Sequence, residues 1–228
     1  MQKKLVAPKA WLAFTLLFLV PLSFLPRFCW AGTVGPTKAG LPFYFGASYG
    51  YGATTWRGLV PTEENQNSAI AMSTPIKVQE GGAAWGLFVG YELIPTFALE
   101  ANYQRYPRAT VFFDKLSLFS FNNNDETELV SNTESLGLMG KIFLLAPHTP
   151  LRLYSGAGLA SVRRQDLLMN QWRFSPTFGL GLNYRFANHF MAELNGNYTA
   201  GFGESQLEPT ATFFPFLYSL SVRLAYIF

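Results

Sequence analysis

Few residues of this chain have the chemistry of a catalyst. Only two histidines occur, His148 and His189, and each stands in a short polar segment between two apolar stretches. A histidine that activates a serine needs that serine and a carboxylate within hydrogen-bonding reach. Both histidines are more simply interpreted as solvated turn residues, because short connections between strands face water.

No motif for a cofactor or a metal is present either. The glycines of residues 179–186, GLGLNYRF, lack the GxGxxG spacing, and no Walker, HExxH or EF-hand pattern occurs. The single cysteine, Cys29, lies in an N-terminal segment that we expect to be removed, which leaves no disulfide and no thiolate ligand. The sequence therefore predicts no catalytic residue, no cofactor and no metal site.

The N-terminal segment has three parts in order. Residues 1–9 are cationic, residues 11–25 are apolar, and RFCWA ends in a small residue before Gly32. This order predicts a secretory signal peptide over residues 1–31, cleaved after Ala31, and a single domain over residues 32–228. A membrane anchor is the alternative, but the apolar run is interrupted by Pro21 and is short against the ~20 residues of a spanning helix.

The charge balance excludes a class of partner. The chain has 17 basic and 14 acidic side chains, and four of the basic ones fall in residues 1–31. The remainder has 13 basic and 14 acidic side chains, so it has no basic excess for binding nucleic acid.

Alternation of apolar and polar residues dominates residues 32–228. In residues 172–186 the even positions are apolar, whereas the odd positions are polar or glycine. Side chains of a strand alternate between its two faces, so this pattern predicts one wholly apolar face. The segment is longer than the usual strand of a soluble sheet. No run after residue 31 reaches the roughly 18 apolar residues of a helical span.

Eight segments alternate in this way, which predicts an all-β fold. They are residues 41–52, 83–93, 97–105 (with a continuation through 113), 135–145, 151–162, 172–186, 190–200 and 218–228. The connections alternate between tight turns and longer loops. Hydrocarbon has no water for unpaired backbone groups, so a sheet with an apolar outer face must close on itself. The sequence predicts an eight-stranded antiparallel up-and-down transmembrane β-barrel.

Most charged residues of these strands fall on the face opposite the apolar one. An Arg or Lys facing the middle of the bilayer costs about 2–4 kcal/mol, so this parity predicts that the charges lie in the barrel interior. Adjacent strands predict Glu100 near Lys141, and Glu193 near both Arg185 and Arg223. Eight strands enclose a space that side chains fill. Glycines on the inner face are expected to make room for the charged chains. The predicted interior ion-pair network comprises Glu100, Lys141, Arg152, Arg185, Glu193 and Arg223, with Glu92 on the same face.

Aromatic residues should form two belts, one at each membrane interface. The strand boundaries predict one belt at the short-turn end, with Phe43, Tyr91, Phe97, Phe186, Phe190 and Phe228. They predict the other at the loop end, with Tyr51, Tyr103, Trp172, Phe174, Tyr198 and Phe214.

The last strand resembles a known sorting signal. Alternating apolar residues that include Leu224 and Tyr226, with Phe228 at the end, look like the C-terminal signal read by the outer-membrane assembly machinery. The strand pattern, the leader and this ending resemble the OmpA-type transmembrane domain and the related family of small outer-membrane β-barrels. This resemblance implies a bacterial outer-membrane location, short periplasmic turns and longer extracellular loops. No peptidoglycan-binding domain follows Phe228, so cell-wall tethering is not expected.

We expect a non-enzymatic protein with a structural or surface-interaction role, in contact with outer-membrane lipid, the barrel assembly machinery and an extracellular partner. The loop of residues 108–134 is the candidate contact, because VFFDKLSLFSF precedes NNNDETE. The competing interpretation is that the strands extend above the bilayer and pack these aromatics on neighbouring loops. Two other functions stay open, an enzyme acting on lipid A acyl chains and a narrow pore.

Overall fold

The computed structural model describes residues 43–56, 75–147, 149–186, 189–202 and 213–228. The described residues all belong to one compact unit, Ala39–Phe228. The predicted signal peptide, residues 1–31, lies outside the described residues. None of the described helices has the length and apolarity to cross a bilayer.

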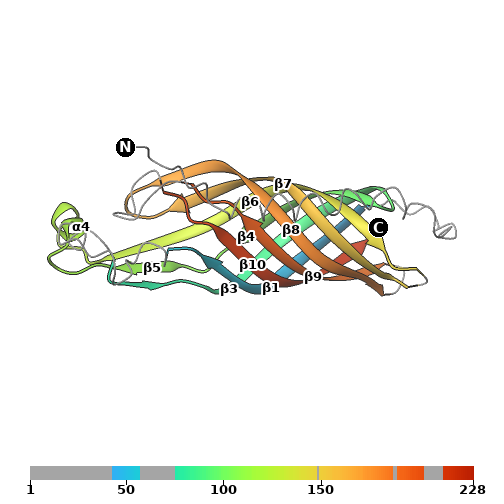
Figure 1. Cartoon of the computed structure of the whole chain (residues 1–228), viewed down its shortest axis with the longest axis horizontal. Coiled ribbons are helices and arrows are strands. Elements are labelled where there is room, and N and C mark those ends of the chain that lie inside the picture. Colours follow the sequence, from blue (N-terminus) through green and yellow to red (C-terminus); the bar gives the residue numbers. More distant parts are fainter. Residues whose placement is uncertain (1–42, 57–74, 148, 187–188, 203–212) are drawn as a thin grey trace, which may run out of the picture. The chain divides into compact units, whose positions relative to one another are not determined.

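Eight strands close into an antiparallel barrel, as predicted (Figure 1). Each strand pairs with its neighbours in the chain, and β10 pairs with β1. The sheet therefore has no free edge along the barrel wall. The strands are β1 (Phe43–Thr54), β3 (Gly82–Ile94), β4 (Phe97–Arg105), β6 (Glu128–Leu145), β7 (Leu151–Gln165), β8 (Asn170–Phe186), β9 (Phe190–Thr199) and β10 (Leu217–Ile227).

The strands differ most from the predicted ranges at the loop end of the barrel. β6 begins at Glu128 and not near residue 135, because its first residues pair with β5 (Ala109–Phe112). The expected continuation of the third strand to residue 113 is broken after Arg105 and resumes as β5. A further short strand, β2 (Lys77–Gln79), pairs with β5 and was not predicted. These strands extend the sheet beyond the barrel towards α4 (Leu118–Asn122; Figure 1).

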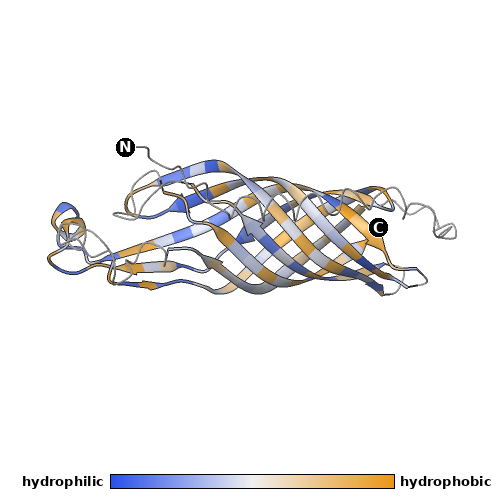
Figure 2. Ribbon diagram, viewed as in Figure 1, coloured by the Kyte–Doolittle hydropathy of each residue, from blue (hydrophilic) through white to orange (hydrophobic). Residues whose placement is uncertain are grey.

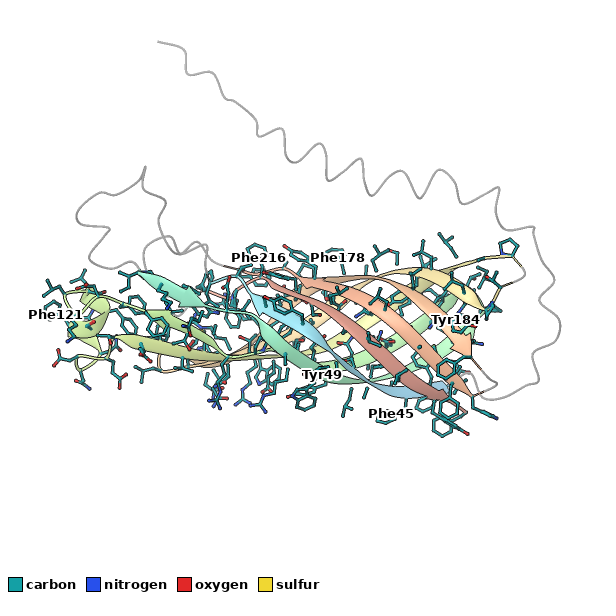
Figure 3. All side chains as sticks on the ribbon, turned by 90° about the horizontal axis from the view of Figure 1, so that it is seen from below. Phe45, Tyr49, Phe121, Phe178, Tyr184 and Phe216 are labelled. Atoms are coloured by element: carbon teal, nitrogen blue, oxygen red, sulfur yellow. The ribbon has the colours of Figure 1, made fainter. Side chains whose placement is uncertain are left out.

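The two faces of the wall follow the period of two in the sequence. In β10 buried and exposed residues alternate from Leu217 to Tyr226, and Arg223 is buried between exposed Val222 and Leu224. Hydropathy alternates along the barrel strands in the same way (Figure 2). Phe45, Tyr49 and Tyr184 lie on the outside of the wall (Figure 3). The outer face is thus apolar, and many of its large side chains stay exposed in the described part of the chain.

One aromatic residue of the predicted belts is misplaced. Phe214 is 1% exposed and packs inside the loop end with Tyr106, Met169 and Leu217. It lies before β10 begins, so strand parity does not determine which way it points. Phe216 is exposed in its place, with its ring 6.1 Å from that of Tyr198.

The inner glycines do not make room for the charged chains as predicted; aromatic rings occupy much of that space. A Cβ at Gly181 would lie 2.7 Å from the ring of Tyr154, and one at Gly90 would overlap the ring of Tyr44. Both tyrosines are almost fully buried. The barrel interior is therefore filled by rings as well as by ions.

Closure can be tested in β10, which pairs with strands on both sides. Proline at Val222 removes a backbone donor in the middle of the ladder, which a central strand does not tolerate. We expect Val222→Pro to abolish the compact band that a closed barrel shows on gels before boiling. Val222→Ala keeps the donor and should retain that band. An unchanged band for the proline variant would contradict a barrel closed through β10.

Candidate functional site

Four charged side chains meet in the middle of the barrel. Glu100 of β4, Lys141 of β6, Glu193 of β9 and Arg223 of β10 all occupy inner-face positions, and each is 1–3% exposed. Lys141 Nζ lies 2.6 Å from a carboxylate oxygen of Glu100 and 3.3 Å from one of Glu193. Arg223 contacts the same two carboxylates, at 2.6 Å each. Two cations and two anions thus form a closed ring, in which every charge has two opposite neighbours.

Neutral side chains complete the hydrogen bonding of this ring. The Tyr44 hydroxyl donates to Glu100 over 3.1 Å, and the Asn183 amide donates to Glu193 over 2.8 Å. The cations also lie over aromatic rings: Lys141 Nζ is 4.3 Å from the centroid of Tyr154, and the Arg223 guanidinium carbon is 3.6 Å from that of Phe88. Buried charges are tolerated when they are paired and hydrogen-bonded in this way.

A second ionic group lies towards the short-turn end. Arg152 donates to Glu92 over 3.0 Å and to the Asn183 side-chain oxygen over 2.8 Å. Arg185 donates to the same Glu92 oxygen over 2.5 Å. The expected proximity of Arg185 to Glu193 is therefore replaced by a contact with Glu92 on the opposite wall. The partner of Arg185 across the β8–β9 ladder is Met191, two residues nearer the turn than Glu193.

The alternation of odd and even positions along each strand predicted which charges lie on the inner face. It did not predict which neutral side chains form hydrogen bonds with them. Tyr44, Asn183 and Tyr154 lie on the inner face of their strands, yet nothing in the sequence shows that the hydroxyls of Tyr44 and Tyr154 lie in the ion network. The contact between Arg152 and Asn183 does have a sequence signal, because these residues are paired across the β7–β8 ladder.

Above the ring the interior holds little free space. A polar cavity of about 10 Å³ is lined by residues that include Ser48, Asn102, Gln104 and Asn197. That volume is close to the minimum for one water molecule. Within the described residues the Gln104 side-chain nitrogen and the Asn197 side-chain oxygen have no hydrogen-bond partner, so a water there would satisfy them.

Apolar side chains close the loop end of the interior. Trp56, Phe213 and Leu129 belong to one buried cluster. Arg164 is fully buried beside it: its guanidinium pairs with Asp166 at 2.6 Å, donates to the Phe213 carbonyl over 2.6 Å, and lies 4.7 Å from the Trp56 ring. Arg164 and Asp166 were not predicted from the sequence, because both lie between the predicted strands 151–162 and 172–186, where strand alternation does not assign a face.

The loop end finishes in a short ordered tip that contains α4. The Ser117 hydroxyl accepts a hydrogen bond from the Phe119 amide and caps the helix. Phe119 stacks on Phe113, with ring centroids 4.0 Å apart, and both are buried. Leu116 and Phe121 are 68% and 63% exposed, and Figure 3 shows Phe121 at the tip. Part of the aromatic loop therefore packs inward, and part stays exposed.

The remaining predicted residues lie at the short-turn end. His189 is within 3.0 Å of the Ile227 carbonyl and stacks on Tyr226, and His148 lies outside the described residues. The members of the predicted assembly signal, Leu224, Tyr226 and Phe228, are exposed on the outer face. Within the described part of the chain, no group of three or more His, Cys, Asp or Glu is placed to bind a metal.

Known proteins share this sequence pattern and fold. Residues 29–228 match the family described as outer membrane protein beta-barrel domain. Neisserial surface protein A (NspA) has a similar structure, with a TM-score of 0.51, 16% identity, and coverage of 82% of this chain and 97% of that chain. The outer membrane protein OprG of Pseudomonas aeruginosa has a TM-score of 0.51, 10% identity, and coverage of 85% and 99%. No curated protein matches the chain significantly. At these identities the solved structures establish a shared fold alone.

The central ring makes a stability prediction. Lys141→Met leaves two buried carboxylates with Arg223 as their only cation, and breaking a buried ion pair costs about 3–5 kcal/mol. Urea unfolding in lipid vesicles, followed by tryptophan fluorescence, should show that the free energy of unfolding falls by that amount. Arg185→Met removes a partly exposed cation from Glu92, which keeps Arg152, so its loss should stay below about 1 kcal/mol. If the two variants lost equal free energy of unfolding, the central ring would not contribute more to stability than the pair of Arg185 and Glu92, and the prediction would be wrong.

Proposed function

The chain belongs to the outer membrane protein beta-barrel domain family, and we propose that within it the protein is a non-enzymatic contact protein of the cell surface. It is a small β-barrel of the bacterial outer membrane. In such barrels the short turns face the periplasm and the longer loops face outward. The tip around α4 therefore lies on the extracellular side, and the barrel anchors it.

The observation behind this proposal is the ordered tip with exposed apolar side chains. β6 runs from the barrel into the small sheet with β5 and β2, and the buried cluster of Trp56, Phe113 and Phe119 supports that sheet. The tip is thus held in place, yet Leu116, Leu118 and Phe121 are exposed. Exposed apolar groups on a supported element are typical of a contact surface.

The interior supports an anchoring role over transport. The central ring, the second ionic group around Glu92 and the apolar cluster at the loop end lie at three levels of the lumen. Among the described residues they leave the small polar cavity described above. We also propose that these ion pairs stabilise the barrel.

Lipid A chemistry has less support. A catalyst for outer-leaflet acyl chains needs a histidine near the extracellular side, whereas His189 lies at the periplasmic end beside Tyr226. Loss of acyl release on changing His148 or His189 would overturn the non-enzymatic proposal.

The position of β10 in the barrel supports a role for its outer-face residues in assembly. It closes the barrel between β1 and β9, so its pairing edges become unavailable once the barrel has formed. Recognition of Leu224, Tyr226 and Phe228 by the assembly machinery would then precede closure.

The tip can be tested on cells that display the full chain. Leu118→Ser/Phe121→Ser removes exposed apolar groups without touching the buried Phe113–Phe119 pair. We expect binding of these cells to octyl-coated beads to fall at least about threefold, since each buried apolar side chain contributes about 1.5–3 kcal/mol. Binding to uncoated beads should not change.

A matched control is Leu167→Ser, which removes an exposed apolar side chain from the β7–β8 connection. It should leave octyl binding near the level of the unchanged chain. If Leu167→Ser lowers binding as much as the tip variant, the contact is a general effect of surface apolarity and the tip proposal fails.

The pore alternative is tested by planar-bilayer recording of the purified protein. A lumen filled at three levels should show no stable large conductance. Sustained openings at neutral pH would show that the interior rearranges into a channel, and would overturn the anchoring role.

A further inference from the structure

A row of polar and aromatic side chains crosses the outer wall of the barrel at its extracellular edge. It runs over β3, β4, β6, β7 and β8, with one residue from each strand, and neighbouring members are directly paired across the ladders. All are exposed or partly exposed on the outer face. The members in order are Trp85, Arg105, Glu134, Arg163 and Trp172.

The adjacent outward row, two residues nearer the periplasm on each strand, is largely apolar. Its members in order are Leu87, Tyr103, Leu136, Ser161 and Phe174. A charged side chain on the lipid face costs about 2–4 kcal/mol at the midplane but about 0–1 kcal/mol near the interface. The change from one row to the next therefore marks the edge of the hydrocarbon, and the charged row lies at the level of the outer-leaflet headgroups.

Glu134 organises this row. It accepts a hydrogen bond from Arg163 over 2.9 Å and another from the Tyr103 hydroxyl over 2.7 Å. Arg163 is further held by Asn170, which accepts from its Nε over 2.9 Å. These contacts fix the guanidinium of Arg163 on the outer wall, above the last apolar side chains.

The row keeps an excess of positive charge. Arg105 is exposed, and among the described residues it makes no hydrogen bond or ion pair, although its charge acts on Tyr103 and Glu134. Arg108 is also exposed, in the link held against β6 by a hydrogen bond from the Tyr106 amide to the Thr133 carbonyl. Two guanidinium groups, those of Arg105 and Arg163, thus act on one carboxylate, and the link after β4 adds the exposed Arg108.

We propose that this row binds the phosphate groups of phosphorylated lipid A in the outer leaflet. The planar guanidinium matches phosphate oxygens in a bidentate way. Basic groups at a membrane surface attract anionic lipid, at about 1 kcal/mol for each Arg. Trp85 and Trp172, one at each end of the row, are residues that favour the headgroup level. This site is separate from the tip and does not depend on the proposed surface contact.

The test uses the purified, folded full chain in neutral detergent, titrated with bisphosphorylated lipid A. Arg105→Gln/Arg163→Gln should weaken binding roughly 10- to 30-fold, the effect of removing two such cations. Lys77→Gln/Lys115→Gln makes the same change of charge at the extracellular sheet and tip, and should change the affinity less than about twofold. Equal weakening by both variants would show a general charge effect and overturn the site.

Two further measurements separate a phosphate site from a purely structural ion pair. Glu134→Gln removes the negative charge but keeps an acceptor for Tyr103 and Arg163, so it should tighten binding of bisphosphorylated lipid A; unchanged or weaker binding contradicts the proposal. Dephosphorylated lipid A should bind the unchanged protein at least about tenfold more weakly. Equal binding of the two lipids would assign the affinity to the acyl chains and overturn the inference.

Discussion

Backbone amide and carbonyl groups find no water in the hydrocarbon of a bilayer, and every strand of this barrel is arranged around that constraint. Each of the eight wall strands pairs on both sides, so no hydrogen-bonding edge meets lipid. Once the sheet has closed, the period of two divides the side chains between lipid and lumen. Within the hydrocarbon the charged side chains of the strands then belong to the interior, because the outer face excludes them.

The interior meets this requirement by combining opposite charges with aromatic rings. The ring of Glu100, Lys141, Glu193 and Arg223 has no net charge, and tyrosine and asparagine side chains use its remaining hydrogen-bonding capacity. Rings of Tyr44 and Tyr154 fill space that the inner glycines leave. The result is a packed lumen, in which an ionic network replaces the apolar core of a soluble protein.

Outside the bilayer the constraint is relaxed, and the architecture changes accordingly. Water can satisfy exposed backbone groups there, so β2 and β5 can form a sheet with open edges. The buried cluster around Trp56 stabilises this extension as an ordinary apolar core. The exposed residues of the tip and the row from Trp85 to Trp172 are the surfaces that we propose for contact with other molecules.

The sequence by itself determined the class of fold and the face of nearly every strand residue. It predicted β4 to the residue, and it placed all the strand charges of the ion network on the inner side. Periodicity along one strand can do this because it reports only which side a residue faces. It cannot report which residue lies opposite, since that depends on the stagger of the closed sheet and on depth in the lumen.

Only the tertiary structure therefore decided that Arg185 meets Glu92, that Phe214 points inward, and that Arg105, Glu134 and Arg163 align across three strands. The residues of that row are far apart along the chain, and antiparallel pairing brings them next to one another on the outer wall. Parity is a local property of the chain, whereas register and contact across the lumen arise only when the barrel closes.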